Sequence, residues 1–341
     1  MIVPDAGSSP TIEEKVAFLS RPEAYPCGSS RVDVIETHMS WVFLTDRHAW
    51  KLKKPIRYDS LDFSTLELRR ADCEREVALN RRLAANVYHG TVPLTTDPDE
   101  KMSIAGDGSV VDWLVQMRRL PRERMLDRAI EQQTVTARDV VAVGRLLAEF
   151  YQREPTVELA PAEYVARLGQ GIRGTREELL RPLFRLPADL VEAASDQPIG
   201  YLSNRRDALE VRVREGWIID AHGDLRPEHV CLEQPPVIID CLEFSRDLRL
   251  LDAASDLSFL MLECERLGAA WIATLIWDTY CEITDDDPPR ELLAFYRSQH
   301  ALTRAKIAVW HLHDAPADQV EKWRSKAVRY LELARGESAA Y

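Results

Sequence analysis

The sequence contains no stretch of apolar residues long enough to cross a lipid bilayer. A membrane-spanning helix needs about 20 mostly apolar residues in a row, and no such run occurs among the 341 residues. The opening segment MIVPDAGSSP also lacks the basic segment and apolar core of a secretory signal peptide. We therefore expect a chain without a membrane contact and without a secretory signal.

Paired cysteines are missing as well. The six cysteines are scattered and no C-x-x-C pair occurs, which argues against a structural zinc site and a disulfide framework. Such cysteines are typical of a protein kept in the reducing cytoplasm. They lie at Cys27, Cys73, Cys231, Cys241, Cys264 and Cys281.

Basic residues are in deficit, and the deficit is uneven along the chain. The net charge is −12, and residues 1–120 hold 16 Lys and Arg against 18 Asp and Glu. The remaining residues, 121–341, hold 28 against 38. This acidity disfavours a nucleic-acid partner, because binding to a phosphate backbone depends on clustered Lys and Arg. It suits a cationic or neutral polar substrate over the C-terminal part, although an acidic surface also serves solubility alone.

The first part of the chain reads as a small antiparallel sheet with helices. A helix is expected at 11–20, where Thr11 and Glu14 have the spacing of a capping box. The β-type runs RVDVIET, SWVFL and HAWKLK are separated by very short polar segments and predict a three-stranded meander. A long helix is expected at 64–84, with Ser64 and Glu67 at capping-box spacing.

After two more strands the chain reads as mostly helical. TVPLTT and SVVDWLVQM predict these strands, which lie on either side of a polar loop at 97–108. A helical periodicity then begins and continues to about residue 215. GWIIDA, VCLE and PVIIDCLEF interrupt this pattern with short apolar runs that predict a β-hairpin. The result is an α+β fold with a five-stranded N-terminal lobe (1–116), a hinge (117–121) and a helical C-terminal lobe (122–341).

The segment HGDLRPEHV concentrates the groups that carry chemistry. Asp224 follows one apolar run and Asp240 ends another, so that short strands would hold both carboxylates with little positional freedom. One carboxylate could hold Mg²⁺ while the other accepts a proton, and Arg226 supplies a fixed positive charge. The alternative is that both aspartates are turn or cap residues, which is a common role beside Gly and Pro.

HGDLRPEHV resembles the catalytic loop of protein-kinase-like enzymes, and in particular the HGDxxxxN loop of aminoglycoside phosphotransferases. The segment VIIDCLEF resembles the metal-binding segment that follows this loop in those enzymes. The segments ETHMSWVF, KKP, LDFSTLE and HGDL are similar to those of an uncharacterised bacterial group within the aminoglycoside phosphotransferase-like family. The resemblance runs from about residue 25 to the C-terminal helices and implies a two-lobed protein-kinase-like fold.

This resemblance implies roles for the catalytic segments. Asp224 would orient the acceptor hydroxyl and accept its proton, and Arg226 would lie near the transferred phosphate. Asp240 would bind Mg²⁺ that bridges the phosphates of ATP. Met117 would mark the hinge beside the adenine ring.

It also implies roles in the N-terminal lobe. Lys51 would contact the α- and β-phosphates, and Glu76 on the long helix would hold that lysine. Lys51 and Lys53 lie on the same face of a strand, so Lys53 remains an alternative. Ser40, in the turn THMS, could offer its hydroxyl to phosphates. Without the resemblance, KLKK reads as a solvated basic run and Glu76 as part of a surface salt bridge.

The sequence departs from the family pattern at His229, where the family has an asparagine that binds a second metal ion. Mg²⁺ prefers oxygen ligands over imidazole. His229 could bind water or phosphate, Glu243 could supply the missing oxygen, or the metal site could be weakened. A glycine-rich motif is also absent between the first two strands, as it often is in aminoglycoside kinases.

Other residues of these segments are expected to support the structure. We interpret His222 as a buried brace of the loop, and Asp252 and Asp256 as a helix cap and a loop brace. Cys231 and Cys241 are expected to fill core space as a reduced pair. His311 is expected to be an ordinary helix residue, like His313 two positions later.

Three functions remain open at this point. The first is an ATP- and Mg²⁺-dependent kinase of a small hydroxylated molecule. The second, prompted by His229, is a nucleotide-binding pseudokinase without turnover. The third is a metal-dependent hydrolase built on histidine and aspartate ligands, although it leaves Lys51 and Glu76 without a purpose. The sequence names no acceptor, because the segments expected to contact it, 150–215 and 262–341, contain no readable motif.

Overall fold

The computed structural model describes residues 10–58, 61–313 and 315–336. The N-terminal segment without a secretory pattern therefore lies mostly outside the described residues. The chain divides into a first unit, Met1–Val135 with Glu228–Leu248, and a second unit, Thr136–Pro227 with Arg249–Tyr341. The segment 228–248 thus groups with the N-terminal residues, and the hinge at 117–121 stays a prediction.

The first unit is built on a fully antiparallel sheet with the strand order β1-β2-β3-β8-β6-β7. The predicted meander β1–β3 is confirmed by its register, in which Val42 faces Lys51 and Ser40 faces Lys53. The strands of this sheet are β1 (Asp33–Glu36), β2 (Ser40–Leu44), β3 (His48–Lys53), β6 (Tyr88–Thr96), β7 (Met102–Ile104) and β8 (Ser109–Arg118).

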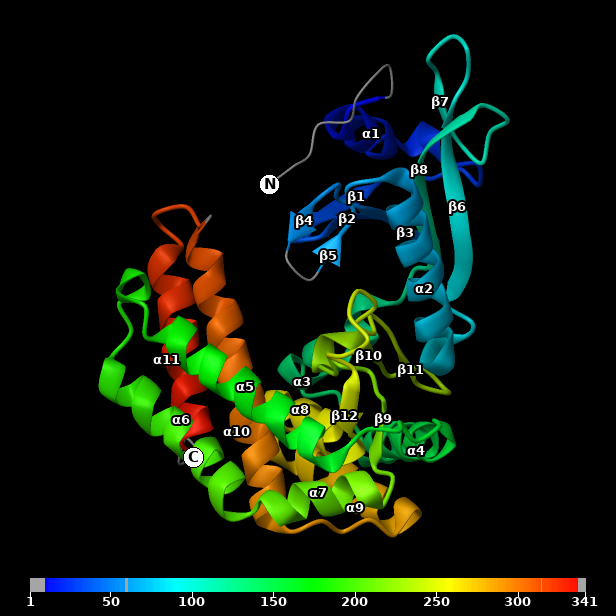
Figure 1. The fold of residues 1–341 in the computed structure, drawn as a ribbon. Coiled ribbons are helices and arrows are strands. Elements are labelled where there is room, and N and C mark those ends of the chain that lie inside the picture. The colour runs from blue at the N-terminus through cyan, green and yellow to red at the C-terminus, as the bar shows by residue number, and fades with distance from the viewer. Residues whose placement is uncertain (1–9, 59–60, 314, 337–341) are drawn as a thin grey trace. The chain divides into compact units, whose positions relative to one another are not determined.

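Alternation along β3 places its side chains on two buried faces of the sheet. On one face Trp50 and Leu52 of β3 pack with Leu19 of helix α1 (Ile12–Leu19). On the other face Ala49 of β3 packs with residues of helix α2 (Leu66–Ala84), which lies against β6 and β8 (Figure 1). Because side chains alternate with a period of two, β3 directs its lysines at 51 and 53 to the α2 face.

The starts of the two helices were predicted with different success. Thr11 caps α1 and forms the predicted capping box with Glu14. The prediction of Ser64 as the cap of α2 was wrong: Thr65 accepts the hydrogen bond from the Leu68 amide, and Ser64 donates instead to Asp62. Two hydroxyl residues in succession made the register ambiguous by one residue.

Two small strand pairs were not predicted. The polar loop at 97–108 contains β7, which pairs with the end of β6 and makes this sheet six-stranded where five strands were expected. A short antiparallel pair of β4 (Arg57–Tyr58) and β5 (Leu61–Asp62) precedes α2. The unpredicted strands β4, β5 and β7 have only two or three residues each, too short for a periodic pattern.

The first unit also contains a short helix and a second strand pair. Helix α3 (Leu126–Glu131) follows β8. The predicted hairpin is confirmed as β10 (Val230–Cys231) paired with β11 (Val237–Ile238), and β11 packs against α2. This packing brings the segment that starts at Asp240 next to the long helix.

The second unit is mostly helical, as predicted. A short antiparallel pair, β9 (Ile218–Asp220) with β12 (Leu250–Asp252), precedes α8. One set of helices packs α9 against α4 and α8, and another packs α10 against α5, α6 and α11 (Figure 1). The helices are α4 (Ala137–Arg153), α5 (Pro161–Leu179), α6 (Ala188–Asn204), α7 (Arg206–Arg214), α8 (Ala253–Arg266), α9 (Ala270–Thr284), α10 (Arg290–Trp310) and α11 (Val320–Ala334).

The predicted α+β fold class is confirmed by these elements. Among the described residues, no helix is long and apolar enough to span a membrane.

Candidate functional site

Two lysines of β3 meet the carboxylates of α2 on the face of the sheet that α2 covers. The side chain of Lys51 is 13% exposed and that of Lys53 is 2% exposed. Buried ammonium groups require compensating charges, and α2 supplies them with Asp72 and Glu76, which lie one helical turn apart.

Lys51 links the long helix to the segment after β11. Its Nζ lies 2.9 Å from Glu76 Oε1 and 3.0 Å from Asp240 Oδ1. Burial alone would lower the pKa of Lys51, but the carboxylates of Asp240 and Glu76 raise it well above its usual value. Lys51 therefore remains a fixed positive charge with one partner, Asp240, that is itself 45% exposed.

Lys53 is enclosed by three carboxylates. Its Nζ lies 2.7 Å from Asp72 Oδ2, 2.7 Å from Glu76 Oε2 and 2.6 Å from Glu243 Oε1. Burial would lower the pKa of Lys53, but Glu243 and Glu76 raise it well above its usual value. Burial raises the pKa of Glu243, but the nearby ammonium groups of Lys53 and Lys51 together outweigh this and lower it overall. This enclosure favours a structural role for Lys53 and leaves Lys51 as the candidate phosphate lysine.

Asp240 follows β11 in a backbone conformation that few residues other than Gly adopt, with φ of +62°. Its amide donates to the hydroxyl of Tyr88 at 3.2 Å, and the next amide, that of Cys241, donates to Asn80 Oδ1 at 2.9 Å. Asn80 also donates to the Glu76 carbonyl at 2.9 Å. Residues of β6 and α2 thus hold the Asp240 turn in place.

Tyr88 and Asn80 were not recognised as site residues from the sequence. Asn80 stands four residues after Glu76 and lies on the same face of the helix. A polar residue among the apolar residues of this face was the sequence signal that could have identified it. For Tyr88 the sequence offered no signal, because its contact with Asp240 joins segments far apart in the chain.

His229 lies beside Asp240, with Nε2 at 3.4 Å from Asp240 Oδ2. Glu243 does not complete an oxygen-rich site with them, since its Oε1 contacts Lys53. Within the described ranges, no group of three or more His, Cys, Asp and Glu side chains is placed to hold a metal ion. Mg²⁺ commonly uses one or two carboxylates together with substrate phosphates and water, so the exposed Asp240 carboxylate fits a first ligand and the imidazole fits poorly.

The HGD loop of the second unit is anchored by Asp256. The amides of His222 and Gly223 donate to Asp256 at 3.2 and 2.9 Å, and Tyr151 donates its hydroxyl to the same carboxylate at 3.0 Å. His222 is wholly buried. The predicted loop brace at Asp256 is therefore confirmed, as is the helix cap at Asp252, which accepts from the Ala254 amide at 2.9 Å.

Asp224 and Arg226 form an ion pair at the accessible end of this loop. Arg226 Nη2 lies 2.8 Å from Asp224 Oδ2, and the two side chains are 17% and 28% exposed. The Asp224 amide donates to His222 Nδ1 at 3.3 Å, so the buried imidazole helps to set the direction of the loop. The arrangement presents a carboxylate beside a guanidinium, which suits proton acceptance next to an anionic group.

Ser40 and Met117 occupy ordered positions in the sheet. The Ser40 hydroxyl lies 3.0 Å from the hydroxyl of Thr37 within the β1–β2 turn and is buried. Met117 pairs with Ala49 and Tyr88 near the end of β8 and is 8% exposed. Their predicted contacts with phosphate and adenine stay predictions.

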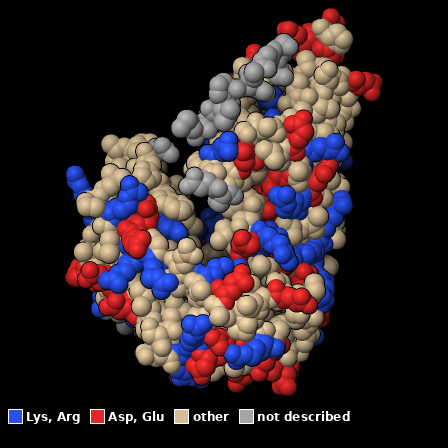
Figure 2. All heavy atoms as spheres, viewed as in Figure 1, with Lys and Arg blue, Asp and Glu red and all other residues tan. Residues whose placement is uncertain are grey.

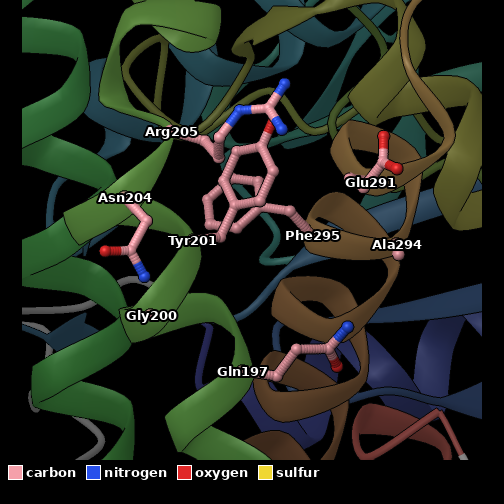
Figure 3. A pocket seen from close by; sticks show the side chains of 8 residues that line it. All are labelled: Gln197, Gly200, Tyr201, Asn204, Arg205, Glu291, Ala294 and Phe295. Atoms are coloured by element: carbon pink, nitrogen blue, oxygen red, sulfur yellow. The ribbon is translucent and has the colours of Figure 1, made fainter.

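A pocket of about 280 Å³ lies between α6 and α10 in the second unit (Figure 3). The stacked rings of Tyr201 and Phe295, with centroids 4.8 Å apart, form one wall. Arg205, directly after α6, and Glu291 of α10 also line it. The HGD loop does not contribute to this pocket.

The acidic excess of the sequence does not gather into one surface on the face seen in Figure 2. Acidic and basic side chains are interspersed over this face. The view gives no support to a broad acidic surface for a cationic substrate.

The relatives with similar sequences have no described activity. The chain is 31% identical over 308 residues to uncharacterised proteins of Mycobacterium tuberculosis and Mycobacterium bovis, covering 89% of this chain. It spans 59% of the length of these relatives. No family model matches the chain.

Solved structures with a similar fold are small-molecule kinases. A choline/ethanolamine kinase family protein from Mesorhizobium loti has a TM-score of 0.55 at 14% identity, covering 94% of each chain. The GDP complex of aminoglycoside 2'-phosphotransferase-IIIa has a TM-score of 0.52 at 13% identity, covering 96% of this chain and 99% of the other.

A thermostable mutant of aminoglycoside phosphotransferase APH(4)-Ia has a TM-score of 0.54 at 9% identity, covering 92% of this chain and 97% of the other. These likenesses agree with the resemblance carried by the HGDL and VIIDCLEF segments. The chain therefore has the protein-kinase-like fold of the aminoglycoside phosphotransferases.

Proposed function

We propose that this chain transfers the γ-phosphate of ATP to a hydroxyl of a small molecule in a Mg²⁺-dependent reaction. The observation that carries the proposal is the pair of contacts from Lys51 to Glu76 and Asp240, at 2.9 and 3.0 Å. A lysine held by a helix carboxylate next to a metal-binding aspartate is the arrangement that kinases use for the phosphates of ATP.

The first unit would supply the nucleotide-phosphate groups. Lys51 would bind the α- and β-phosphates, and Glu76 would keep its ammonium in position. Asp240 would bind Mg²⁺, which when bound neutralises charge on the phosphate oxygens. The 45% exposure of the Asp240 side chain supports this role, because a ligand must remain accessible to metal and phosphate.

The second unit would supply the acceptor groups. The acceptor oxygen attacks the γ-phosphorus while the bond from this phosphorus to the β–γ bridging oxygen breaks, and ADP leaves. Asp224 would take the proton of the acceptor hydroxyl, and Arg226 would stabilise negative charge on the transferred group. We expect the reaction to take place in the cytoplasm and to involve neither nucleic acid nor membrane.

His229 favours a second candidate, a nucleotide-binding pseudokinase. Its imidazole stands 3.4 Å from Asp240 Oδ2, in the position where the family has an oxygen ligand. A pseudokinase would bind ATP without transferring phosphate. No cluster of metal ligands in the described part of the chain favours the hydrolase hypothesis.

Thermal stability and ADP release separate these candidates. A kinase is stabilised by ATP with Mg²⁺ and releases ADP faster when an acceptor from a panel of sugars, amino alcohols and aminoglycosides is added. A pseudokinase is stabilised but releases no ADP with any acceptor. A chain that ATP does not stabilise refutes both.

Asp224→Asn tests the proposed base within the same assay. We expect ADP release to fall by about 100-fold or more, the usual contribution of general base catalysis, with ATP binding unchanged. Asp278→Asn, a matched change at an exposed position on α9, should leave the rate unchanged. An Asp224→Asn variant as active as wild type contradicts the assignment.

A further inference from the structure

A second pocket of the second unit, of about 290 Å³, adjoins the HGD loop. One wall is Arg226, whose Nη2 pairs with Asp224 at 2.8 Å. Helices α10 and α11 supply the other walls, with Arg304 and two aliphatic residues from α10 and Trp323 and Lys326 from α11. A molecule in this pocket would therefore lie beside the proposed base.

The lining is cationic in a part of the sequence that is acidic. Arg226, Arg304 and Lys326 all line the pocket, and its lining contains no Asp or Glu. Residues 121–341 as a whole carry 38 acidic residues against 28 basic ones. A local reversal of charge sign in a concave site raises the local concentration of anions.

The carboxylate of Glu263 compensates the positive charge of Arg304 only in part. Arg304 Nε lies 3.7 Å from Glu263 Oε1, which is beyond hydrogen-bonding distance. Glu263 is already engaged by Arg266 Nε and the Tyr330 hydroxyl, each at 2.7 Å. Arg304 is 12% exposed, so a ligand anion reaching it would bind in a largely desolvated site, where charged hydrogen bonds are strong.

One side of the pocket is aromatic. The Trp323 indole stacks on the His311 imidazole with ring centroids 3.9 Å apart and an angle of 15° between the planes. Lys326 Nζ lies 5.1 Å from the centroid of the Trp323 ring. A flat ring beside fixed cations suits a small carbon frame, such as a sugar ring, that carries an anionic group.

We infer that this pocket binds the acceptor and that the acceptor carries a phosphate or carboxylate in addition to the hydroxyl that is phosphorylated. The inference rests on the proposed function for the role of Asp224. Arg304 and Lys326 bind the anionic group, while Arg226 and Asp224 face the reacting end. A polycationic aminoglycoside would meet the like charges of Arg304 and Lys326 here, so the pocket selects against it.

Binding without nucleotide tests the pocket independently of catalysis. Calorimetric titration of the full chain uses inorganic phosphate, glucose 6-phosphate and gluconate as anionic probes, with glucose and kanamycin as neutral and cationic probes. We expect at least one anionic probe to bind at least 10-fold more tightly than glucose and kanamycin. We also expect its affinity to fall as ionic strength rises.

Lys326→Gln locates the binding site. It should weaken binding of the anionic probe at least 3-fold, and Lys326→Glu should weaken it further. Arg329→Gln removes the same charge from an exposed position of α11 outside the pocket lining, and it should change binding less than 2-fold. Circular dichroism of each variant confirms that the helices are intact.

The binding experiment overturns the inference if no anionic probe binds more tightly than glucose, or if Lys326→Gln leaves binding of the anionic probe unchanged. The proposed kinase activity is judged separately, by ADP release. Release of ADP only with neutral or cationic acceptors refutes the anionic acceptor and leaves the kinase standing. Probe binding that depends on Lys326, without ADP release by any acceptor, supports the pocket and refutes the kinase.

Discussion

Replacement of the two lysines of β3 should have opposite consequences for stability and for nucleotide binding. In Lys53→Met, three carboxylates lose the cation that lies 2.6 to 2.7 Å from each of them. In Lys51→Met, Glu76 keeps its contact with Lys53 at 2.7 Å, and the Asp240 carboxylate is exposed enough to be hydrated. The first change therefore removes a structural charge and the second a functional one.

The magnitudes follow from burial. Removing one partner of a buried ion pair costs about 3–5 kcal/mol, because the remaining charge stays in a desolvated site. Asp72 and Glu76 are 3% and 1% exposed, so Lys53→Met belongs to this range. Lys51→Met loses two contacts, but Glu76 keeps its contact with Lys53 and the Asp240 carboxylate is 45% exposed. We therefore expect a cost of about 1 kcal/mol, as for a solvent-accessible ion pair.

Urea unfolding, with hydrogen exchange of the β3 and α2 peptides, measures the difference. Lys53→Met should lower the free energy of unfolding about three times as much as Lys51→Met. Lys101→Met, a matched change at an exposed position of the same unit, should have little effect. Equal losses at positions 51 and 53, or the larger loss at position 51, would refute the assignment of Lys53 to structure.

Three further predictions concern pH, the metal and the core of the second unit. Burial lowers the pKa of His300 from 6.5 to about 4. Between these pH values the unfolded chain binds a proton at this histidine that the folded chain does not. The free energy of unfolding should therefore fall by about 3 kcal/mol as the pH drops from 6.5 to 4. His300→Gln should remove this part of the slope in urea unfolding, while His38→Gln, at an exposed position, should keep it. His229→Asn should tighten Mg²⁺ binding in the presence of ATP, because an amide oxygen suits Mg²⁺ better than imidazole; weaker binding in a titration would contradict this. Arg212→Met should cost about 3–5 kcal/mol of unfolding free energy, since Arg212 lies 2.7 Å from the buried Asp252; a loss below 1 kcal/mol would contradict the reasoning.

Local patterns predicted the elements whose signal lies within one stretch of sequence. The meander β1–β3 follows from short turns between alternating runs, and the cap at Thr11 follows from its spacing to Glu14. The hairpin β10–β11 was also predicted, from the short apolar runs VCLE and PVIIDCLEF that interrupt the helical pattern. These features depend on neighbours in the chain and need no tertiary information.

Features that depend on contacts between distant segments were not predictable. Lys51 and Lys53 share a strand face, and the sequence left both open as the phosphate lysine. The packing of α2 distinguishes them, because Lys51 has an exposed partner whereas Lys53 is enclosed by three carboxylates. The cationic pocket joins residues from three separate segments, near 226, 304 and 326. No periodicity or motif relates these positions to one another.

Titration of ATP with Mg²⁺ into wild-type chain and into Lys51→Met tests the central claim most directly. We expect wild type to bind the nucleotide, and Lys51→Met to bind it at least 10-fold more weakly with its fold retained by circular dichroism, while Lys101→Met binds like wild type. Absence of ATP binding by wild type, or equal affinity in wild type and Lys51→Met, would contradict the claim that Lys51, Glu76 and Asp240 form a nucleotide-phosphate site.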